Sequence, residues 1–395
     1  MYRRDGQKRS ASGAPRRREK TMKKGPSEPE IGEGIGLDGE GLLPILDGAV
    51  AKPLHLPADL DAEVSIAKDA RRPLDERLEA FENVFESEVG DTHLARARNI
   101  ERETGMRQLF LKFDGGNPTG TQKDRIAFAQ AMDAMRRGFD TVTAATCGNY
   151  GAALALAASF AGLRCEVFVP SGYHVRRAAE IGRYGAEMIT VDGDYEAAVV
   201  RSREEAEARD LYDANPGGAN TTIQLRAYGE IAYEIYDELR DAPAAIAVPV
   251  SNGTTLAGVY RGFQSLYRRG KTSHMPRIVA GSSYKKNPIV QSFLSGSESC
   301  EDLDPARIRE TAVNEPLINW HSIDGDLALD AIRSTSGWAS YASDRAMSKY
   351  SRLISTSEGL SVMPASAAGL IALLDEGWRQ QLPNDRYVVI LTGRR

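Results

Sequence analysis

Residues 117–125 read Asn-Pro-Thr-Gly-Thr-Gln-Lys-Asp-Arg and join two stretches of different periodicity. The apolar run before them, Leu109–Phe113, is predicted to be a buried strand. From Lys123 to Arg137, apolar residues recur at helical spacing, so a helix is expected there. Because the intervening loop is built of Gly, Asn, Pro and Thr, Lys123 is expected to begin a helix directly after a loop with few bulky side chains.

The same order of strand, loop and helix recurs along the rest of the chain. Strands that alternate with helices form parallel sheets covered on both faces. An Asn-, Pro- and Gly-rich break at 214–220 divides the series. The expected fold class is therefore α/β, with two lobes that each hold a twisted, mainly parallel sheet flanked by helices. Further strands are predicted at 140–145, 164–169, 187–191, 244–250, 277–281 and 387–391. An Ala- and Leu-rich helix is predicted to end at 161, and further helices are predicted at 174–184, 194–209, 222–240, 256–269 and 364–376.

The composition predicts a large folded chain with an acidic body. Of the 395 residues, 42% are hydrophobic, which is enough for one large or two medium domains. The net charge of −5 is too small to indicate a nucleic acid or an anionic membrane as partner. Residues 1–55 are rich in basic, polar, Gly and Pro residues, so they are predicted to be a disordered basic and polar extension.

Neither a membrane segment nor a metal site is expected. No run approaches the roughly 18 consecutive apolar residues of a membrane span, and no apolar leader follows the basic start. A cytoplasmic location is therefore the expectation. The three cysteines, Cys147, Cys165 and Cys300, and the five histidines show neither a disulfide framework nor metal-ligand spacing.

Three loops of small residues are candidate binding sites. Residues 115–123, 146–151 and 251–255 each follow a predicted strand and precede a helix. The carboxyl ends of parallel strands meet at one edge of a sheet, and free N–H groups at the start of a helix bind anions. None of the loops has the glycine spacing of a Walker or dinucleotide-binding loop, so nucleotide and nicotinamide cofactors are disfavoured.

Lys123 is the candidate for covalent chemistry. An amine at the positive end of a helix dipole has its charged form disfavoured, and imine formation requires the neutral amine. The local pattern alone leaves an ordinary solvated lysine open.

The wider sequence resembles the threonine synthases, which are pyridoxal-phosphate (PLP) enzymes with the tryptophan-synthase β fold, or fold type II. Residues 117–125 are similar to the family's NPTGSFKDR segment. The similarity spans roughly residues 85–393. Further matches follow in the family's order, with TCGNYG at 146–151, PVSNGT at 249–254, EG at 358–359, PASA at 364–367 and LTG at 391–393.

The resemblance implies a role for each matching residue. Lys123 would hold pyridoxal 5'-phosphate as a Schiff base and move the proton at Cα of the substrate. Asn149 would bind the phenolic oxygen of the cofactor, and Thr392 would face its pyridine nitrogen. The cofactor phosphate is expected on Ser251, Asn252, Gly253, Thr254 and Thr255, and the substrate carboxylate on Thr146, Cys147, Gly148, Asn149 and Tyr150.

The resemblance also implies an architecture. A large cofactor-binding lobe is expected to comprise residues 56–116 and 223–395, and a smaller mobile lobe residues 117–222. A homodimer is expected on the same ground.

Three residues beside the expected substrate depart from the family's pattern. Cys147 stands in place of a serine, Tyr150 in place of a small hydroxyl residue, and Gln122 in place of an aromatic residue. Tyr150 is expected to crowd or stack on the substrate side of the cofactor ring. Because the cofactor-binding residues are retained, the reaction class is better defined than the substrate.

The implied activity is that of a PLP-dependent lyase acting on a small amino-acid substrate. A threonine synthase removes phosphate from O-phosphohomoserine by γ-elimination and then adds water, which requires a second anion site. The cationic candidates for that site are Lys112, Arg125, Arg176 and Arg177. Two alternatives stay open: β-replacement or β-elimination on a serine- or phosphoserine-type substrate, as in cysteate synthases, cysteine synthases or dehydratases, and a PLP-binding protein without turnover.

Overall fold

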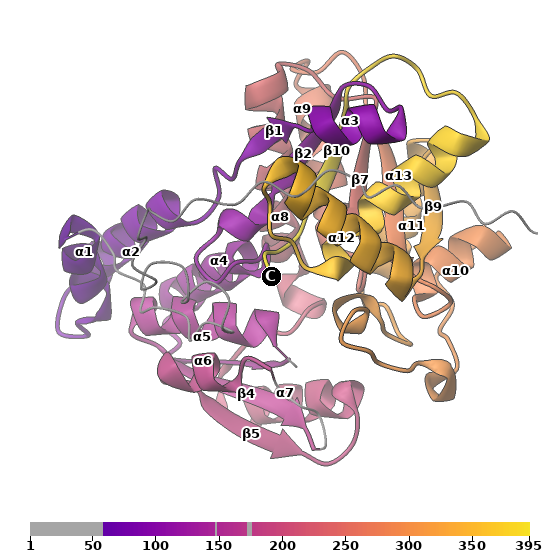
Figure 1. Ribbon diagram of the computed structural model, residues 1–395. Coiled ribbons are helices and arrows are strands. Elements are labelled where there is room, and N and C mark those ends of the chain that lie inside the picture. The colour runs from indigo at the N-terminus through magenta and orange to yellow at the C-terminus, as the bar shows by residue number, and fades with distance from the viewer. Residues whose placement is uncertain (1–57, 147, 172–175) are drawn as a thin grey trace, which may run out of the picture. The chain divides into compact units, whose positions relative to one another are not determined.

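A six-stranded sheet joins segments from both ends of the chain (Figure 1). All neighbouring strands are parallel except the first pair, which is antiparallel. The computed structural model describes residues 58–395 except 147 and 172–175, so the extension predicted for 1–55 lies outside the described residues. The strand order is β1 (Leu94–Arg96), β2 (Leu109–Phe113), β10 (Tyr387–Leu391), β7 (Ala245–Pro249), β8 (Arg277–Ser283) and β9 (Trp338–Ala342).

A second sheet, of four parallel strands, lies within residues 141–213. Its order is β5 (Glu187–Val191), β4 (Arg164–Pro170), β3 (Thr141–Ala145) and β6 (Tyr212–Asp213). Every residue of β3 is buried, because helices α5 (Asn149–Ala161) and α7 (Tyr195–Arg209) pack against this sheet. Central strands that are buried on both faces are typical of parallel sheets.

Helices cover the six-stranded sheet and connect it to the smaller one. Helices α8 (Thr221–Leu239) and α9 (Thr254–Arg268) pack closely, since a Cβ on Gly262 would lie 2.5 Å from the carbonyl oxygen of Gly229. Among the described helices, none is long and apolar enough to cross a membrane. The remaining α-helices of the described residues are α1 (Ala58–Lys68), α2 (Leu74–Glu88), α3 (Arg98–Thr104), α4 (Lys123–Arg136), α6 (Ala178–Arg183), α10 (Pro288–Ser295), α11 (Gly325–Ser334), α12 (Asp344–Glu358) and α13 (Ala368–Arg379).

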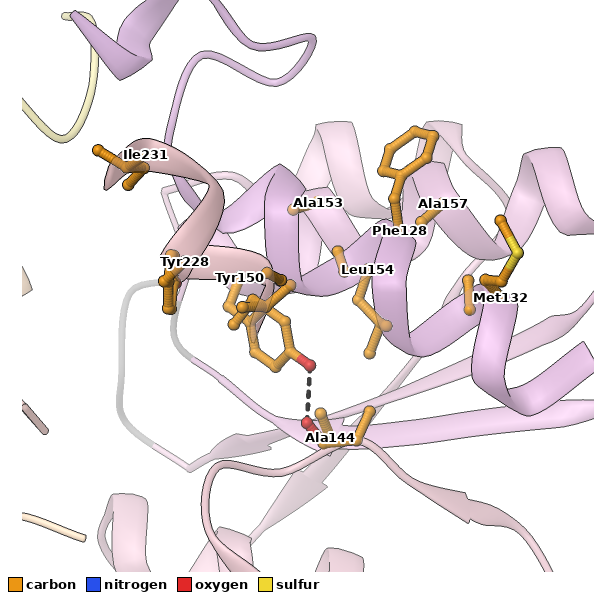
Figure 2. Close-up of a cluster of buried hydrophobic side chains, with 14 of the residues drawn as sticks. Phe128, Met132, Ala144, Tyr150, Ala153, Leu154, Ala157, Tyr228 and Ile231 are labelled. Carbon is orange, nitrogen blue, oxygen red and sulfur yellow. Dashed lines mark hydrogen bonds between the residues drawn. The ribbon is translucent and has the colours of Figure 1, made fainter. Parts of the chain in front are cut away.

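A shared apolar core lies where α4, α5 and α8 meet the smaller sheet. Figure 2 shows Phe128 and Met132 of α4, Leu154 of α5 and Tyr228 of α8 in this cluster. All of them are at most 5% exposed. The core fixes the start of α4, and with it the position of Lys123, relative to both sheets.

The predicted α/β class with two mainly parallel sheets is confirmed, and most predicted elements match within a few residues. One helix differs at its start, because residues 364–367 form a 3₁₀ turn before α13 begins at Ala368. The helix predicted over 174–184 is described only as α6, and residues 174 and 175 lie outside the described part. The lobe boundaries and the mobility of the smaller lobe stay predictions.

Candidate active site

Four loops at the carboxyl ends of strands surround one cavity of about 310 Å³. They follow β2, β3, β7 and β10. This is the edge at which parallel α/β sheets bind ligands. Cys147 lies outside the described residues. The cavity lining includes every other residue that the resemblance assigned to the cofactor or the substrate carboxylate: Lys123, Thr146, Gly148, Asn149, Tyr150, Ser251, Asn252, Gly253, Thr254, Thr255 and Thr392.

Lys123 is the first residue of α4, and aromatic rings lie beside its amine. Its Nζ is 6.0 Å from the centroid of the Tyr150 ring and 5.9 Å from that of the Tyr228 ring. Burial lowers the pKa of Lys123 to about 8, and the charge of Asp324 opposes this shift. At pH 7 about one Lys123 amine in ten is therefore neutral, far more than for an ordinary lysine. A neutral amine is both a nucleophile and a base.

We expect the apoprotein to capture pyridoxal phosphate faster as the pH rises towards about 8, and the rate to level off above that pH. Only the neutral amine attacks an aldehyde, and its fraction grows until the pH exceeds the pKa. Stopped-flow absorbance of the apoprotein mixed with excess cofactor measures the rate. The same cofactor with methylamine provides the reference for ionisation of the cofactor itself. A rate that, after this correction, still rises above pH 10 would contradict the lowered pKa.

Residues 251–255, which form the turn after β7 and the first two residues of α9, have the features of an anion cradle. Gly253 has φ +93°, and a Cβ on it would lie 2.7 Å from the carbonyl oxygen of Asp324. The first N–H groups of α9 have no acceptor within the helix, and the positive end of the helix dipole lies there. This turn fits the phosphate of pyridoxal phosphate, and the nearby Lys123 fits its aldehyde.

Side chains from later segments brace this turn. Asn287 Nδ2 donates to the carbonyl oxygen of Ser251 at 3.0 Å, and Asn319 Nδ2 donates to Asn252 Oδ1 at 2.9 Å. Ser322 Oγ donates to the carbonyl oxygen of Ser251 at 3.1 Å. These three residues lie 36 to 71 positions further along the chain. No local sequence pattern marks these residues, so they could not be predicted from the motifs.

The buried carboxyl group of Asp324 contacts the same segment. It is 4% exposed and accepts a hydrogen bond from the Thr254 hydroxyl. Burial raises the pKa of Asp324, while the Thr254 hydroxyl and the charge of Lys123 act to lower it. Because the Thr254 hydroxyl is committed to Asp324, the backbone N–H is the group that Thr254 can offer to an anion.

Thr392, directly after β10, and Ser366, in the 3₁₀ turn before α13, form a hydroxyl pair. Their Oγ atoms are 3.0 Å apart, and Ser366 Oγ accepts from the backbone N–H of Gly393 at 3.1 Å. Both residues are buried, and Thr392 lines the cavity. A hydroxyl group does not hold a pyridine nitrogen protonated as a carboxylate does, so a hydroxyl pair facing that nitrogen would suit elimination and replacement better than transamination.

Asn149 begins α5 and is held from both sides. Its Oδ1 accepts from Arg177 Nη1 at 3.1 Å, and its Nδ2 lies 3.7 Å from Met363 Sδ. Arg177 also donates to the carbonyl oxygen of Thr119 at 2.8 Å and pairs with Glu180 at 2.5 Å. Arg177 therefore fixes the loops around Asn149, and its guanidinium is largely committed to these partners.

The hydroxyl of Tyr150 points into the protein core. It donates to the carbonyl oxygen of Ala214 at 2.6 Å and accepts from Gln130 Nε2 at 2.5 Å. The residue is 6% exposed and belongs to the cluster in Figure 2. The ring borders the cavity beside Lys123, while the hydroxyl is fixed away from it.

Two of the four candidates for a substrate-phosphate site are wrong. Arg125 is 3% exposed and pairs with Asp114 at 2.9 Å and Glu234 at 2.5 Å. Lys112 is 1% exposed and pairs with Glu234 at 2.5 Å. Burial favours a high pKa for Glu234, but these two cations hold its pKa at about 2. Arg125 and Lys112 thus join β2, α4 and α8, and neither lines the cavity.

A family model described as "Pyridoxal-phosphate dependent enzyme" matches residues 85–393. The threonine synthase of Methanocaldococcus jannaschii is 31% identical over 309 residues, which cover 77% of this chain and 74% of that protein. The threonine synthase of Methanosarcina acetivorans is 29% identical over 308 residues, with the same two shares.

Solved structures of the same architecture include a threonine deaminase from Solanum lycopersicum, with a TM-score of 0.67 and 15% identity, covering 87% of this chain and 92% of that one. Maize serine racemase has a TM-score of 0.65 and 19% identity, covering 80% of this chain and 92% of that one. At such identities the likeness establishes the fold, which is that of the tryptophan-synthase β-like, fold-type-II enzymes.

Proposed function

The chain belongs to the pyridoxal-phosphate-dependent enzyme family, and from this premise we propose that it catalyses elimination or replacement on an amino acid, with O-phosphohomoserine as substrate and threonine as product. The observation that carries the proposal is that the Lys123 amine, with its lowered pKa, lines one cavity with the 251–255 anion cradle and the Thr392 hydroxyl. The threonine synthases that resemble this chain at about 30% identity support the choice of substrate.

The cofactor, when bound, supplies an electron sink that stabilises negative charge at Cα of the substrate. Lys123 would hold the cofactor, and its amine, with its lowered pKa, is suited to take and return the proton at Cα of the substrate. The first turn of α9 anchors the phosphate of the cofactor, and the N–H groups at the start of α5 receive the substrate carboxylate. Asn149, oriented by Arg177, would hydrogen-bond the phenolic oxygen of the cofactor.

Phosphate release separates this reaction from its alternatives. The holoenzyme is incubated with O-phosphohomoserine or O-phosphoserine, and free phosphate and the amino-acid product are measured. We expect phosphate and threonine from O-phosphohomoserine only, at a rate that Lys123→Ala reduces to background. Phosphate from O-phosphoserine alone would instead identify β-chemistry, and phosphate from neither would overturn the substrate class. The homodimer and the cytoplasmic location stay predictions.

A further inference from the structure

A buried carboxylate lies next to Lys123 on α4, and the proposed chemistry does not use it. Asp124 is fully buried, and both of its oxygens accept hydrogen bonds from Thr119. Oδ2 accepts from the backbone N–H at 3.0 Å, and Oδ1 accepts from the hydroxyl at 2.8 Å. Because burying a carboxylate is unfavourable unless hydrogen bonds compensate, these two bonds fix Thr119 against the start of α4.

The contacts continue from Thr119 to the cavity. The carbonyl oxygen of Thr119 accepts from Arg177 Nη2 at 2.8 Å, and Arg177 Nη1 donates to Asn149 Oδ1 at 3.1 Å. Since Oδ1 is committed to Arg177, the NH₂ group of Asn149 is the part of this amide that can donate to the phenolic oxygen of the cofactor. Four residues thus form a relay that begins in the core and ends at the cavity: Asp124, Thr119, Arg177 and Asn149.

The loop that contains Thr119 is held separately on its other side. The backbone N–H of Gln122 donates to the carbonyl oxygen of Thr392 at 3.0 Å, and the carbonyl oxygen of Gly120 accepts from the N–H of Arg394 at 2.8 Å. Neither bond involves Asp124. Loss of the charge on Asp124 would therefore release the Thr119 side of the loop and leave the side next to β10 in place.

The ionised form of Asp124 matches its surroundings, because both Thr119 groups that face it are donors. Burial nevertheless raises the pKa of Asp124 to about 7, while the Thr119 bonds and the charge of Arg177 act to lower it. The other ionisable groups around it come from α4, from α6 and its two flanking residues, and from α8: Lys123, Arg125, Arg177, Glu180, Tyr184 and Tyr228. Burial raises the pKa of both tyrosines. Asp124 therefore changes charge around neutral pH, where the arginines stay charged and the tyrosines stay neutral.

We propose that Asp124 is a positioning residue: its carboxylate, acting through the relay, holds the Asn149 amide in place for the phenolic oxygen of the cofactor. This inference rests on the proposed function for the attachment of the cofactor, and it does not depend on which amino acid is the substrate. Protonated Asp124 cannot accept both bonds from Thr119, so the relay loosens and the amide loses its fixed direction. The relay is therefore closed above about pH 7 and open below it.

The absorbance of the bound cofactor tests the relay without turnover, because hydrogen bonds to the cofactor tune its electronic state. The holoenzyme is titrated from about pH 5.5 to 9 without substrate, and its visible band is expected to change with a midpoint near pH 7. Thr119→Val should move this midpoint upward by at least about one unit, because the ionised carboxylate loses a hydrogen bond. Thr119→Ser should restore it. Asp124→Asn should abolish the transition, and the control Asp237→Asn, at a 70% exposed position of α8, should keep it.

Asn149→Ala distinguishes the relay from a direct effect of the Asp124 charge on the cofactor. This variant lacks the amide at the end of the relay, so its visible band should no longer change between about pH 6 and 8. A transition at the native midpoint in Asn149→Ala would overturn the relay. An unchanged midpoint in Thr119→Val would overturn the role of Asp124.

Hydrogen exchange of the apoprotein tests the relay without the cofactor. At about pH 8, Asp124→Asn should exchange at least about tenfold faster than the native protein in the peptides that contain Thr119 and Asn149. Thr119→Val gives the same comparison with the carboxylate retained, and Asp237→Asn should change neither peptide. Faster exchange around Thr119 alone, or in neither peptide, would overturn the proposal. If the holoenzyme shows no visible band, the proposed function fails, while this measurement still decides whether the relay exists.

Discussion

Lys123→Ala is expected to lose turnover by at least about a thousandfold, together with the visible absorbance of the lysine-bound cofactor. The substitution removes the covalent attachment and the base that moves the Cα proton, and proton transfer by a positioned side chain alone contributes about 10²–10⁴-fold. Activity and absorbance of the purified variant measure the loss. Lys349→Ala, at an exposed position of α12, is the control and should retain both. Full activity in Lys123→Ala would refute the assignment.

Stability distinguishes this loss from misfolding. The pKa of Lys123 lies below its value in an unfolded chain, so burial disfavours the charged amine in the native state. Below about pH 8 the native apoprotein therefore carries an unfavourable buried charge, and this cost fades as the pH rises from about 8 towards 10.5. The apo form of Lys123→Ala should unfold at pH 7 no more easily than the native apoprotein.

Arg125→Met is expected to lower the free energy of unfolding by about 3–5 kcal/mol, because it leaves the buried carboxylate of Asp114 without its cationic partner. Asp114 is fully buried and retains the Thr92 hydroxyl, which donates to it at 2.7 Å. Glu234 keeps Lys112. Denaturant unfolding of the apoprotein measures the change. A loss of less than about 1 kcal/mol would show that the cluster is not a unit of stability.

Arg136→Met on the same helix is the matched control. Arg136 is 55% exposed and lies 3.8 Å from Glu82, so its removal should change the free energy of unfolding by no more than about 0.5 kcal/mol. The pH dependence gives a second check. Because the pKa of Glu234 falls from 4.5 to about 2 on folding, the stability it contributes is complete above pH 4.5 and declines as the pH falls towards 2.

The core of the site follows from local sequence. The loop at 114–122 and the helix after it can be predicted because Gly, Asn and Pro interrupt two apolar patterns. The segment 251–255 can be predicted in the same way. Each loop follows a predicted parallel strand, so their meeting at one edge follows from topology. The described residues that the sequence indicated for the cofactor and the substrate carboxylate therefore line one cavity.

The supporting residues do not follow from local sequence. The partners of Arg125 lie 11 and 109 positions from it along the chain, so its ion pairs cannot be predicted from the motif that contains it. For the same reason no local pattern marks Asp324 or Asn319, which only the fold brings to the site. Strands β1 and β6 have only three and two residues, too few to show a period.

Trapping the cofactor on its lysine tests the central claim most directly. The holoenzyme is reduced with borohydride, digested and analysed by mass spectrometry for the peptide that carries the cofactor. A single modified peptide is expected, in which Lys123 bears the reduced cofactor. A cofactor on any other lysine, or a holoenzyme with visible absorbance and no trapped peptide, would contradict it.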